Sequence, residues 1–395
     1  MDGHMCNETD GVVEDSMRVP GLRSSRRVME TDAHRVKRRA LRVGALMLAW
    51  ALLAGLAIPV MGEQPRALEL SGDYPMTHDP SIARERDNYY VFATGFAPGG
   101  GQFAIRCSHD LHAWKLCGQV FDRIPGWIQK ASPKTRELWA PDISFFSGSY
   151  HLYYAYSTFG SNTSGIGLAT NATLDPTSPR YRWVDEGLVL KSAAGDDFNA
   201  IDPNVVLDGK GQPWLSFGSF WSGIKMRRLD AATGKLWATD TRLYALATRT
   251  RPEGAPPAQP NLPPDWEAIE APFIVRHGGF YYLFVSFDLC CRGVKSTYRT
   301  MVGRSERVTG PYVDASGKAM LQGGGTELLA GNARWRGPGG ESVLQRPEGD
   351  ILVFHAYDGK TGKPALQIST LTWKNGWPHA ALEGSKTGQQ AHAMR

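Results

Sequence analysis

Runs of apolar and aromatic residues alternate with short polar turns along most of this chain, and one such unit recurs. In each copy an acid, usually beside a proline, precedes an apolar run, a tight turn and a second apolar or aromatic strand. One copy begins Asn199-Ala200-Ile201-Asp202-Pro203-Asn204 and ends in the aromatic run 214–221. The other copies begin at Asp79, Asp142, Glu270 and Glu341.

The five acids are spaced by 63, 60, 68 and 71 residues. A four-stranded propeller blade takes about 40 to 50 residues, so these longer units fit blades whose loops carry function. The repeat therefore predicts an all-β chain folded as a five-bladed β-propeller. Equivalent residues of different blades would ring one mouth of the central channel. The alternative is that Asp-Pro and Ala-Pro-Asp only mark turns that lead into strands.

The first 62 residues differ from the rest. Residues 1–42 are polar and end in a basic cluster, and residues 43–61 are almost wholly apolar. This order is typical of a secretory signal that ends at Gly62, with Met17 and Met29 as alternative starts. A retained membrane anchor is the alternative, since 19 apolar residues nearly span a bilayer. We expect a secreted or periplasmic protein with residues 63–395 as its propeller domain.

Composition excludes some functions. The net charge of +5 falls to +3 without residues 1–62, so nucleic acid is not an expected partner. The 12 Trp, 14 Tyr and 15 Phe suit short strands and a surface on which sugars stack. No Gly/Ser linker or charge run divides the chain, and we expect one domain with its core at about 70–385, acting as a monomer.

Five cysteines do not form a disulfide framework in a chain of this length. Cys6 lies in the segment expected to be removed. Cys107 and Cys117 flank a predicted hairpin and could form a disulfide if their Cα atoms lie within about 7 Å. For the adjacent Cys290 and Cys291, packing of two small buried residues is favoured over a disulfide. No Cys/His spacing resembles a zinc site.

The acids indicate a hydrolytic chemistry. Hydrolysis of a glycosidic bond needs one carboxylic acid that protonates the leaving oxygen and one carboxylate that activates water or attacks carbon. A third carboxylate near the acid would raise its pKa. Asp79, Asp202 and Glu270 could supply these groups from three blades. A separation of roughly 6.5 to 9.5 Å between base and acid would predict inversion at the anomeric carbon.

Five motifs, spread from about residue 74 to 374 and in order, resemble those of glycoside hydrolase family 43, and within it the endo-α-1,5-L-arabinanases. They are Thr77-His78-Asp79-Pro80-Ser81-Ile82, Leu138-Trp139-Ala140-Pro141-Asp142-Ile143, Asn199-Ala200-Ile201-Asp202-Pro203, Ser216-Phe217-Gly218-Ser219-Phe220-Trp221-Ser222-Gly223, and Phe287-Asp288-Leu289-Cys290-Cys291-Arg292-Gly293 with its continuation to Ser305.

The resemblance implies a five-bladed propeller and an inverting reaction. Asp79 would be the general base, Glu270 the general acid, and Asp202 the residue that raises the pKa of the acid and orients it. Asp142 would be a supporting acid. Trp139 would offer a stacking face, although packing in the blade core is the alternative for Trp139 and Trp221. The residues implied to contact the sugar are Asp79, Trp139, Gly167, Asn199, Ala200, Ile201, Asp202, Ser219, Phe220 and Trp221.

His355 matches the family histidine that points along the channel toward a hydrated calcium ion, although a lone histidine at a strand end is more often a core residue. Calcium is the expected ion because oxygen ligands and water would dominate there. The family usually reads Gly-Pro-Gly-His-Asn-Ser where this chain has Gly337-Pro338-Gly339-Gly340-Glu341-Ser342. A histidine is absent here and a carboxylate added, so the channel chemistry or its ion can differ.

The resulting hypothesis is an exported hydrolase that cleaves internal α-1,5-L-arabinofuranosidic bonds of arabinan with inversion. One alternative is an exo-acting arabinofuranosidase or β-xylosidase of the same fold, which the size of the products would distinguish. Another is a propeller that binds carbohydrate without turnover, since a fold alone does not fix function.

Overall fold

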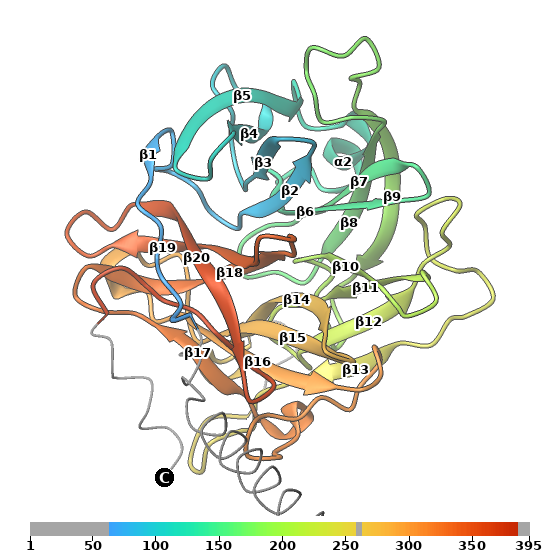
Figure 1. Cartoon of the computed structure of the whole chain (residues 1–395). Helices are drawn as coiled ribbons and strands as arrows, with labels where there is room; N and C mark the ends of the chain where they lie inside the picture. Colours follow the sequence, from blue (N-terminus) through green and yellow to red (C-terminus); the bar gives the residue numbers. More distant parts are fainter. Residues whose placement is uncertain (1–62, 258–262, 386–395) are drawn as a thin grey trace, which may run out of the picture. The chain divides into compact units, whose positions relative to one another are not determined.

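The computed structural model of the protein describes residues 63–257 and 263–385, whose strands form five sheets (Figure 1). Four sheets have four antiparallel strands in chain order, and the first carries an additional strand that pairs in parallel with its fourth. The predicted signal or anchor in residues 1–62, with its apolar stretch 43–61 and Cys6, lies outside the described residues. Among those that are described, no helix has the length and hydropathy needed to cross a membrane.

Each sheet is one blade. Blade 1 contains β1 Ser71–Gly72, β2 Ser81–Glu85, β3 Asn88–Phe92, β4 Gln102–Ser108 and β5 Ala113–Phe121. Blade 2 contains β6 Trp139–Phe146, β7 Ser149–Tyr156, β8 Ser164–Asn171 and β9 Val184–Ser192. Blade 3 contains β10 Asn204–Leu207, β11 Pro213–Phe217, β12 Ile224–Arg228 and β13 Tyr244–Ala247.

Blade 4 contains β14 Ile269–His277, β15 Phe280–Phe287, β16 Arg299–Ser305 and β17 Thr326–Ala330. Blade 5 contains β18 Trp335–Leu344, β19 Asp350–Asp358, β20 Pro364–Lys374 and β21 Trp377–His379. The described helices are short: α2 Gly126–Ala131 and the 3-10 helices η1 Asp265–Glu267, η2 Gly293–Lys295 and η3 Met320–Gln322.

The first full strand of each blade lies at the centre, and these strands contact one another in a closed circle. β2 contacts β6, β6 contacts β10, β10 contacts β14, β14 contacts β18, and β18 returns to β2. The sheets radiate from this centre (Figure 1). The predicted all-β class and five-bladed propeller are therefore confirmed.

Five apolar clusters fill the spaces between neighbouring blades. The second strand of a blade is covered on both faces, and β15 is buried at seven of its eight positions. A strand buried on both faces needs apolar residues throughout rather than at alternate positions. This is why the aromatic runs of the repeat, such as 280–287, show no polar alternation.

The blade repeat is marked by a backbone position rather than by the acids. Residues 79, 140, 202, 271 and 340 have left-handed φ angles of 46°, 44°, 55°, 53° and 58°. Two residues further along, Ser81, Asp142 and Asn204 each accept a hydrogen bond from a backbone N–H of the next blade, at 3.0, 2.9 and 2.9 Å. These bonds join blade 1 to blade 2, blade 2 to blade 3 and blade 3 to blade 4.

This register corrects one prediction. Asp79 and Asp202 occupy the same repeat position, but Glu270 comes one residue before it, Glu341 one after it and Asp142 two after it. The prediction that five acids open their blades at equivalent positions is wrong for these three. Near-constant spacing hid the difference, because shifts of one or two residues are small beside the variation in length from blade to blade.

Asp142 joins blades 2 and 3. Its Oδ1 accepts a hydrogen bond from Asn204 Nδ2 at 3.0 Å, and its Oδ2 accepts one from the backbone N–H of Val205 at 2.9 Å. Burial raises the pKa of this carboxyl to about 7, and the two donors act in the opposite direction. Asp142 is therefore held by its neighbours within the fold, in keeping with a supporting role.

We expect Asp142→Ala to lower the free energy of unfolding by about 1–3 kcal/mol, because two buried N–H donors lose their acceptors. Urea denaturation followed by tryptophan fluorescence measures the change. Asp142→Asn keeps one acceptor oxygen and should lose less. An unchanged denaturation midpoint in Asp142→Ala would show that the bonds between blades 2 and 3 do not stabilise the fold.

The described residues contain two disulfides. Cys107 and Cys117 join β4 to β5 with a Cα–Cα distance of 5.9 Å, which meets the condition set from the sequence. Cys290 and Cys291 also form a disulfide, so the packing interpretation of this pair is wrong. That interpretation assumed two buried residues, whereas Cys291 is exposed and Cys290 only half-buried.

Candidate active site

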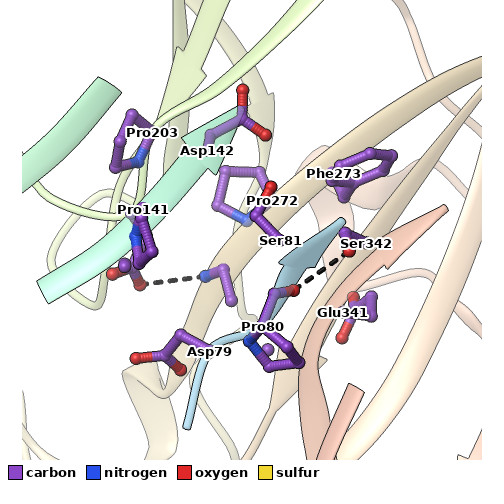
Figure 2. A pocket seen from close by; sticks show the side chains of 14 residues that line it. Asp79, Pro80, Ser81, Pro141, Asp142, Pro203, Pro272, Phe273, Glu341 and Ser342 are labelled. Atoms are coloured by element: carbon purple, nitrogen blue, oxygen red, sulfur yellow. Dashed lines mark hydrogen bonds between the residues drawn. The ribbon is translucent and has the colours of Figure 1, made fainter. Parts of the chain in front are cut away.

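A small cavity of about 30 Å³ lies where the inner strands converge. Every blade contributes to its lining, which includes four acidic residues. Three of them, Asp79, Asp142 and Glu341, are labelled in Figure 2. The lining residues are Asp79, Pro80, Ser81, Ala140, Pro141, Asp142, Asp202, Pro203, Ala271, Pro272, Phe273, Gly340, Glu341 and Ser342. The five inner strands thus gather acids that are far apart in sequence.

Asp79 is held in its charged form. Its Oδ2 accepts a hydrogen bond from Thr94 Oγ1 at 2.7 Å and lies 2.9 Å from His78 Nδ1. Burial alone would raise the pKa of Asp79, but the charge and hydrogen bond of His78 outweigh it, with further help from His355 and Thr94, and hold the pKa well below its usual range. Asp79 is therefore ionised at neutral pH, as a general base must be.

Glu270, in β14, is held in the opposite state. Burial raises the pKa of Glu270 to about 7, and the charge of Asp79 acts in the same direction. The hydroxyl of Ser219 donates a hydrogen bond to Glu270 Oε2 at 2.6 Å, which lowers the pKa, as does the charge of His78. A carboxyl with this pKa retains its proton near neutral pH, as a general acid must.

Asp202 is the third acid of the site. Its Oδ2 accepts a hydrogen bond from the backbone N–H of Ala271, next to Glu270, at 3.1 Å. Burial raises the pKa of Asp202, and the charges of Glu270 and Asp79 raise it further. Because two buried like charges disfavour each other, Asp202 and Glu270 hold a proton between them. The structure therefore brings the three sequence-predicted acids into one electrostatic system.

His355, in β19, lies beside the base. Its side chain is fully buried, its ring stacks on His78 with centroids 3.8 Å apart, and its Nδ1 accepts a hydrogen bond from the backbone N–H of Asp79 at 3.1 Å. Its Nε2 is buried with no hydrogen-bond partner. A Cβ at Gly340 would lie 2.7 Å from Asp79 Oδ1 and 2.9 Å from the His355 ring, so this close approach requires glycine there.

The predicted sugar-contact residues have different side-chain environments. Ala200 and Ile201 are buried, so only their backbone could face a sugar. Asn199 is buried and its Oδ1 has no partner. Phe220 and Trp221 are half-buried at left-handed φ angles of 54° and 47°. Their predicted sugar contacts stay predictions.

Trp139 and Gly167 come from blade 2. Trp139 is half-buried at the start of β6, which leaves part of its ring for stacking. Gly167 pairs with Tyr154 across β7 and β8, and an added Cβ would lie 2.5 Å from the Tyr154 ring. Close packing on Tyr154 therefore already explains this glycine, and its approach to a sugar stays a prediction.

Sequence reasoning missed the residues that set the charge of Asp79. His78 lies inside the Thr-His-Asp-Pro motif but received no role. Thr94 follows β3. Its hydroxyl donates a hydrogen bond to Asp79 Oδ2 at 2.7 Å and accepts one from the backbone N–H of Ala140 at 2.7 Å. Tyr357 bonds to His78 Nε2 at 2.6 Å. No local pattern marks Thr94 or Tyr357, because they reach Asp79 only through the tertiary fold.

A propeller whose channel mouth pairs an ionised carboxylate with a protonated carboxyl has the parts of a glycoside hydrolase. The family model for glycosyl hydrolases family 43 matches residues 72–378, and the chain belongs to this family.

Individual relatives cover most of the chain. The extracellular endo-α-(1→5)-L-arabinanase 1 of Bacillus subtilis strain 168 is 43% identical over 305 residues, 77% of this chain and 87% of the relative. The extracellular exo-α-(1→5)-L-arabinofuranosidase ArbA of Cellvibrio japonicus is 43% identical over 76% of this chain and 85% of its own. The solved structure of a Cellvibrio cellulosa α-L-arabinanase complexed with arabinohexaose is similar to this chain with a TM-score of 0.71 and 41% sequence identity. The match covers 77% of this chain and 95% of that chain.

Proposed function

We propose that the protein hydrolyses internal α-1,5-L-arabinofuranosidic bonds of arabinan with inversion. One observation carries the proposal: the fold sets an ionised Asp79 beside an Asp202–Glu270 pair that retains a proton. Asp79 takes a proton from the attacking water, and Glu270 gives one to the leaving glycosidic oxygen. Asp202 keeps the proton available to Glu270. The arabinan-active relatives support this substrate.

Exo-action is the second candidate, because a relative with the same 43% identity is an exo-acting arabinofuranosidase. Digestion of debranched linear arabinan by residues 63–395, with chromatography of the early products, separates the two. A ladder of oligosaccharides supports endo-hydrolysis, and arabinose alone supports exo-action. If no product forms while an aryl xyloside is hydrolysed, the proposed substrate is wrong.

We also propose that the protein is secreted. Two relatives are described as extracellular. The Cys107–Cys117 and Cys290–Cys291 disulfides are in keeping with an oxidising compartment. Detection of the protein in the culture medium, cleaved near Gly62, would support secretion.

Calcium in the channel is a further part of this proposal. The buried Nε2 of His355 has no hydrogen-bond partner, and His78, Asp79 and His355 offer ligand atoms that all lie within 4.8 Å of one another, which fits a site for one ion. A bound calcium ion would supply positive charge near the acids. If calcium binds the folded state, its addition to chelator-treated protein should raise the melting temperature, whereas magnesium should do so less. An unchanged melting temperature would contradict the site.

The pH profile should report the environment of Glu270. Asp202→Asn removes the carboxyl that shares a proton with Glu270. Losing that proton no longer places two like charges together, so the basic limb of kcat/KM moves to lower pH. Ser219→Ala removes a hydrogen bond that stabilises the charged form, so the basic limb moves to higher pH. Rates on an arabinan oligosaccharide across pH 4 to about 9 measure both shifts. Shifts of the same sign would contradict these assignments.

A further inference from the structure

Cys290 and Cys291 lie in the loop between β15 and η2 and have no part in the proposed hydrolysis. Their disulfide is at the surface: Cys291 is exposed and Cys290 half-buried. In the other described disulfide, Cys107 is only 9% exposed and Cys117 half-buried. A small reductant in solution therefore reaches the Cys290–Cys291 bond more readily than the Cys107–Cys117 bond.

This pair is connected to the proposed base. The backbone N–H of Cys291 donates a hydrogen bond to the hydroxyl oxygen of Tyr357 at 2.9 Å. That hydroxyl bonds to His78 Nε2 at 2.6 Å, and His78 Nδ1 lies 2.9 Å from Asp79 Oδ2. The Sγ of Cys291 is itself 3.8 Å from His78 Nε2. The disulfide is thus one imidazole ring away from Asp79.

The atoms form a suitable donor set for a metal. A ring nitrogen of His78 and the two sulfur atoms all lie within 4.8 Å of one another, and Nε2 is the nitrogen that lies 3.8 Å from Cys291 Sγ. One imidazole nitrogen with two thiolates is a ligand set typical of zinc and of softer cations such as cadmium. The exposure of Cys291 leaves room for a water molecule as a fourth ligand.

The loop is held by bonds that do not depend on the disulfide. Thr297 N–H donates to the carbonyl of Leu289 at 2.8 Å, and Thr297 Oγ1 accepts from Leu289 N–H at 3.2 Å. Arg292 N–H donates to Ser296 Oγ at 3.0 Å. Opening the sulfur–sulfur bond therefore leaves both cysteines near His78.

We propose that reduction of the Cys290–Cys291 disulfide creates a binding site for one thiophilic divalent cation of the zinc class, held by His78 Nε2 and both thiolates. A dithiol supplies the two electrons: the protein disulfide breaks, two protein thiols form, and the dithiol becomes a cyclic disulfide. Metal binding then releases the two thiol protons to solvent as the metal–sulfur bonds form.

Binding at this site affects the base. A cation on His78 Nε2 displaces the Tyr357 hydroxyl, and the two thiolates balance the charge of the cation. The ring of His78 is then held by the metal instead of by Tyr357, which moves the ring nitrogen that lies 2.9 Å from Asp79 Oδ2. Hydrolysis of arabinan by the metal-loaded protein is expected to fall about tenfold or more, because a displaced general base takes a proton from water less effectively. This consequence rests on the proposed function, whereas the binding site does not.

The test uses residues 63–395, reduced with a dithiol, freed of reductant under nitrogen and titrated with cadmium. Thiolate-to-cadmium charge transfer gives an ultraviolet absorption band that needs no substrate. We expect the band to saturate at one cadmium per chain in reduced protein and to be absent from oxidised protein. Reduced protein with two freed thiols but no band would overturn the proposal.

Variants locate the site. Cys290→Ser with Cys291→Ser should abolish the band, and Cys107→Ser with Cys117→Ser should keep it. His78→Ala should weaken cadmium binding by about tenfold or more. A band of equal strength in the Cys290→Ser, Cys291→Ser protein would overturn the proposal. If oxidised protein hydrolyses no arabinan, the proposed function fails, while the cadmium band still decides the binding site.

Discussion

Glu270→Gln is expected to slow hydrolysis of linear arabinan by about 10²- to 10⁴-fold, the usual contribution of a general acid. An arabinofuranoside with a good leaving group, such as 4-nitrophenolate, should lose far less, because that oxygen leaves without protonation. Gln has the shape of Glu and keeps an acceptor for the Ser219 hydroxyl, which lies 2.6 Å from Glu270 Oε2. The effect therefore reports the missing proton rather than a damaged fold.

Glu267→Gln is a matched control. Glu267 is buried three residues earlier, and burial raises its pKa as well, but it lies in η1 outside the group of acids described above. This variant should retain the rate on both substrates. Initial rates on linear arabinan and on the aryl arabinofuranoside are compared for the three proteins. Equal losses on both substrates in Glu270→Gln would contradict its role as the acid.

The fold could be predicted because a propeller repeats the same packing arrangement in every blade. Every blade needs a buried second strand, so aromatic runs such as 280–287 recur at similar spacing. The acids do not obey that repeat. Asp79 and Asp202 share a backbone position with φ angles of 46° and 55°, whereas Glu270 is offset by one residue and Asp142 by two. Packing imposes a strict register on the blades but none on the functional acids. The spacing therefore identified the acids, but it did not show that they occupy different positions in their blades.

The charge states of the site depend on residues that the sequence does not bring together. Asp79 and Glu270 are both buried carboxyls, and burial alone would raise the pKa of each. They differ because His78 and Thr94 bond directly to Asp79, while Glu270 accepts a bond from the neutral hydroxyl of Ser219. Environment thus separates a base from an acid of similar chemistry. The motifs identified the two acids, and only the tertiary contacts explain why their pKa values move apart.

Asp79→Asn is expected to reduce kcat on arabinan by about 10²- to 10⁴-fold, and the aryl arabinofuranoside should show the same loss. Both substrates need a base to take a proton from water, whatever the leaving group. Asn tolerates the left-handed φ of 46° found at this position, so the fold should be kept. A loss of rate on both substrates distinguishes the base Asp79 from the acid Glu270, because Glu270→Gln should keep most of its rate on the aryl arabinofuranoside.

Azide gives the decisive control, because this anion attacks carbon without giving up a proton. Asp79→Gly keeps the left-handed backbone without strain and opens space for the anion, so azide should restore turnover of the aryl arabinofuranoside and form an arabinosyl azide. Asp202→Gly changes the same backbone position of blade 3, where φ is 55°, but removes no base. Azide should not restore its rate. Equal rescue of both variants, or of neither, would show that Asp79 does not activate the water.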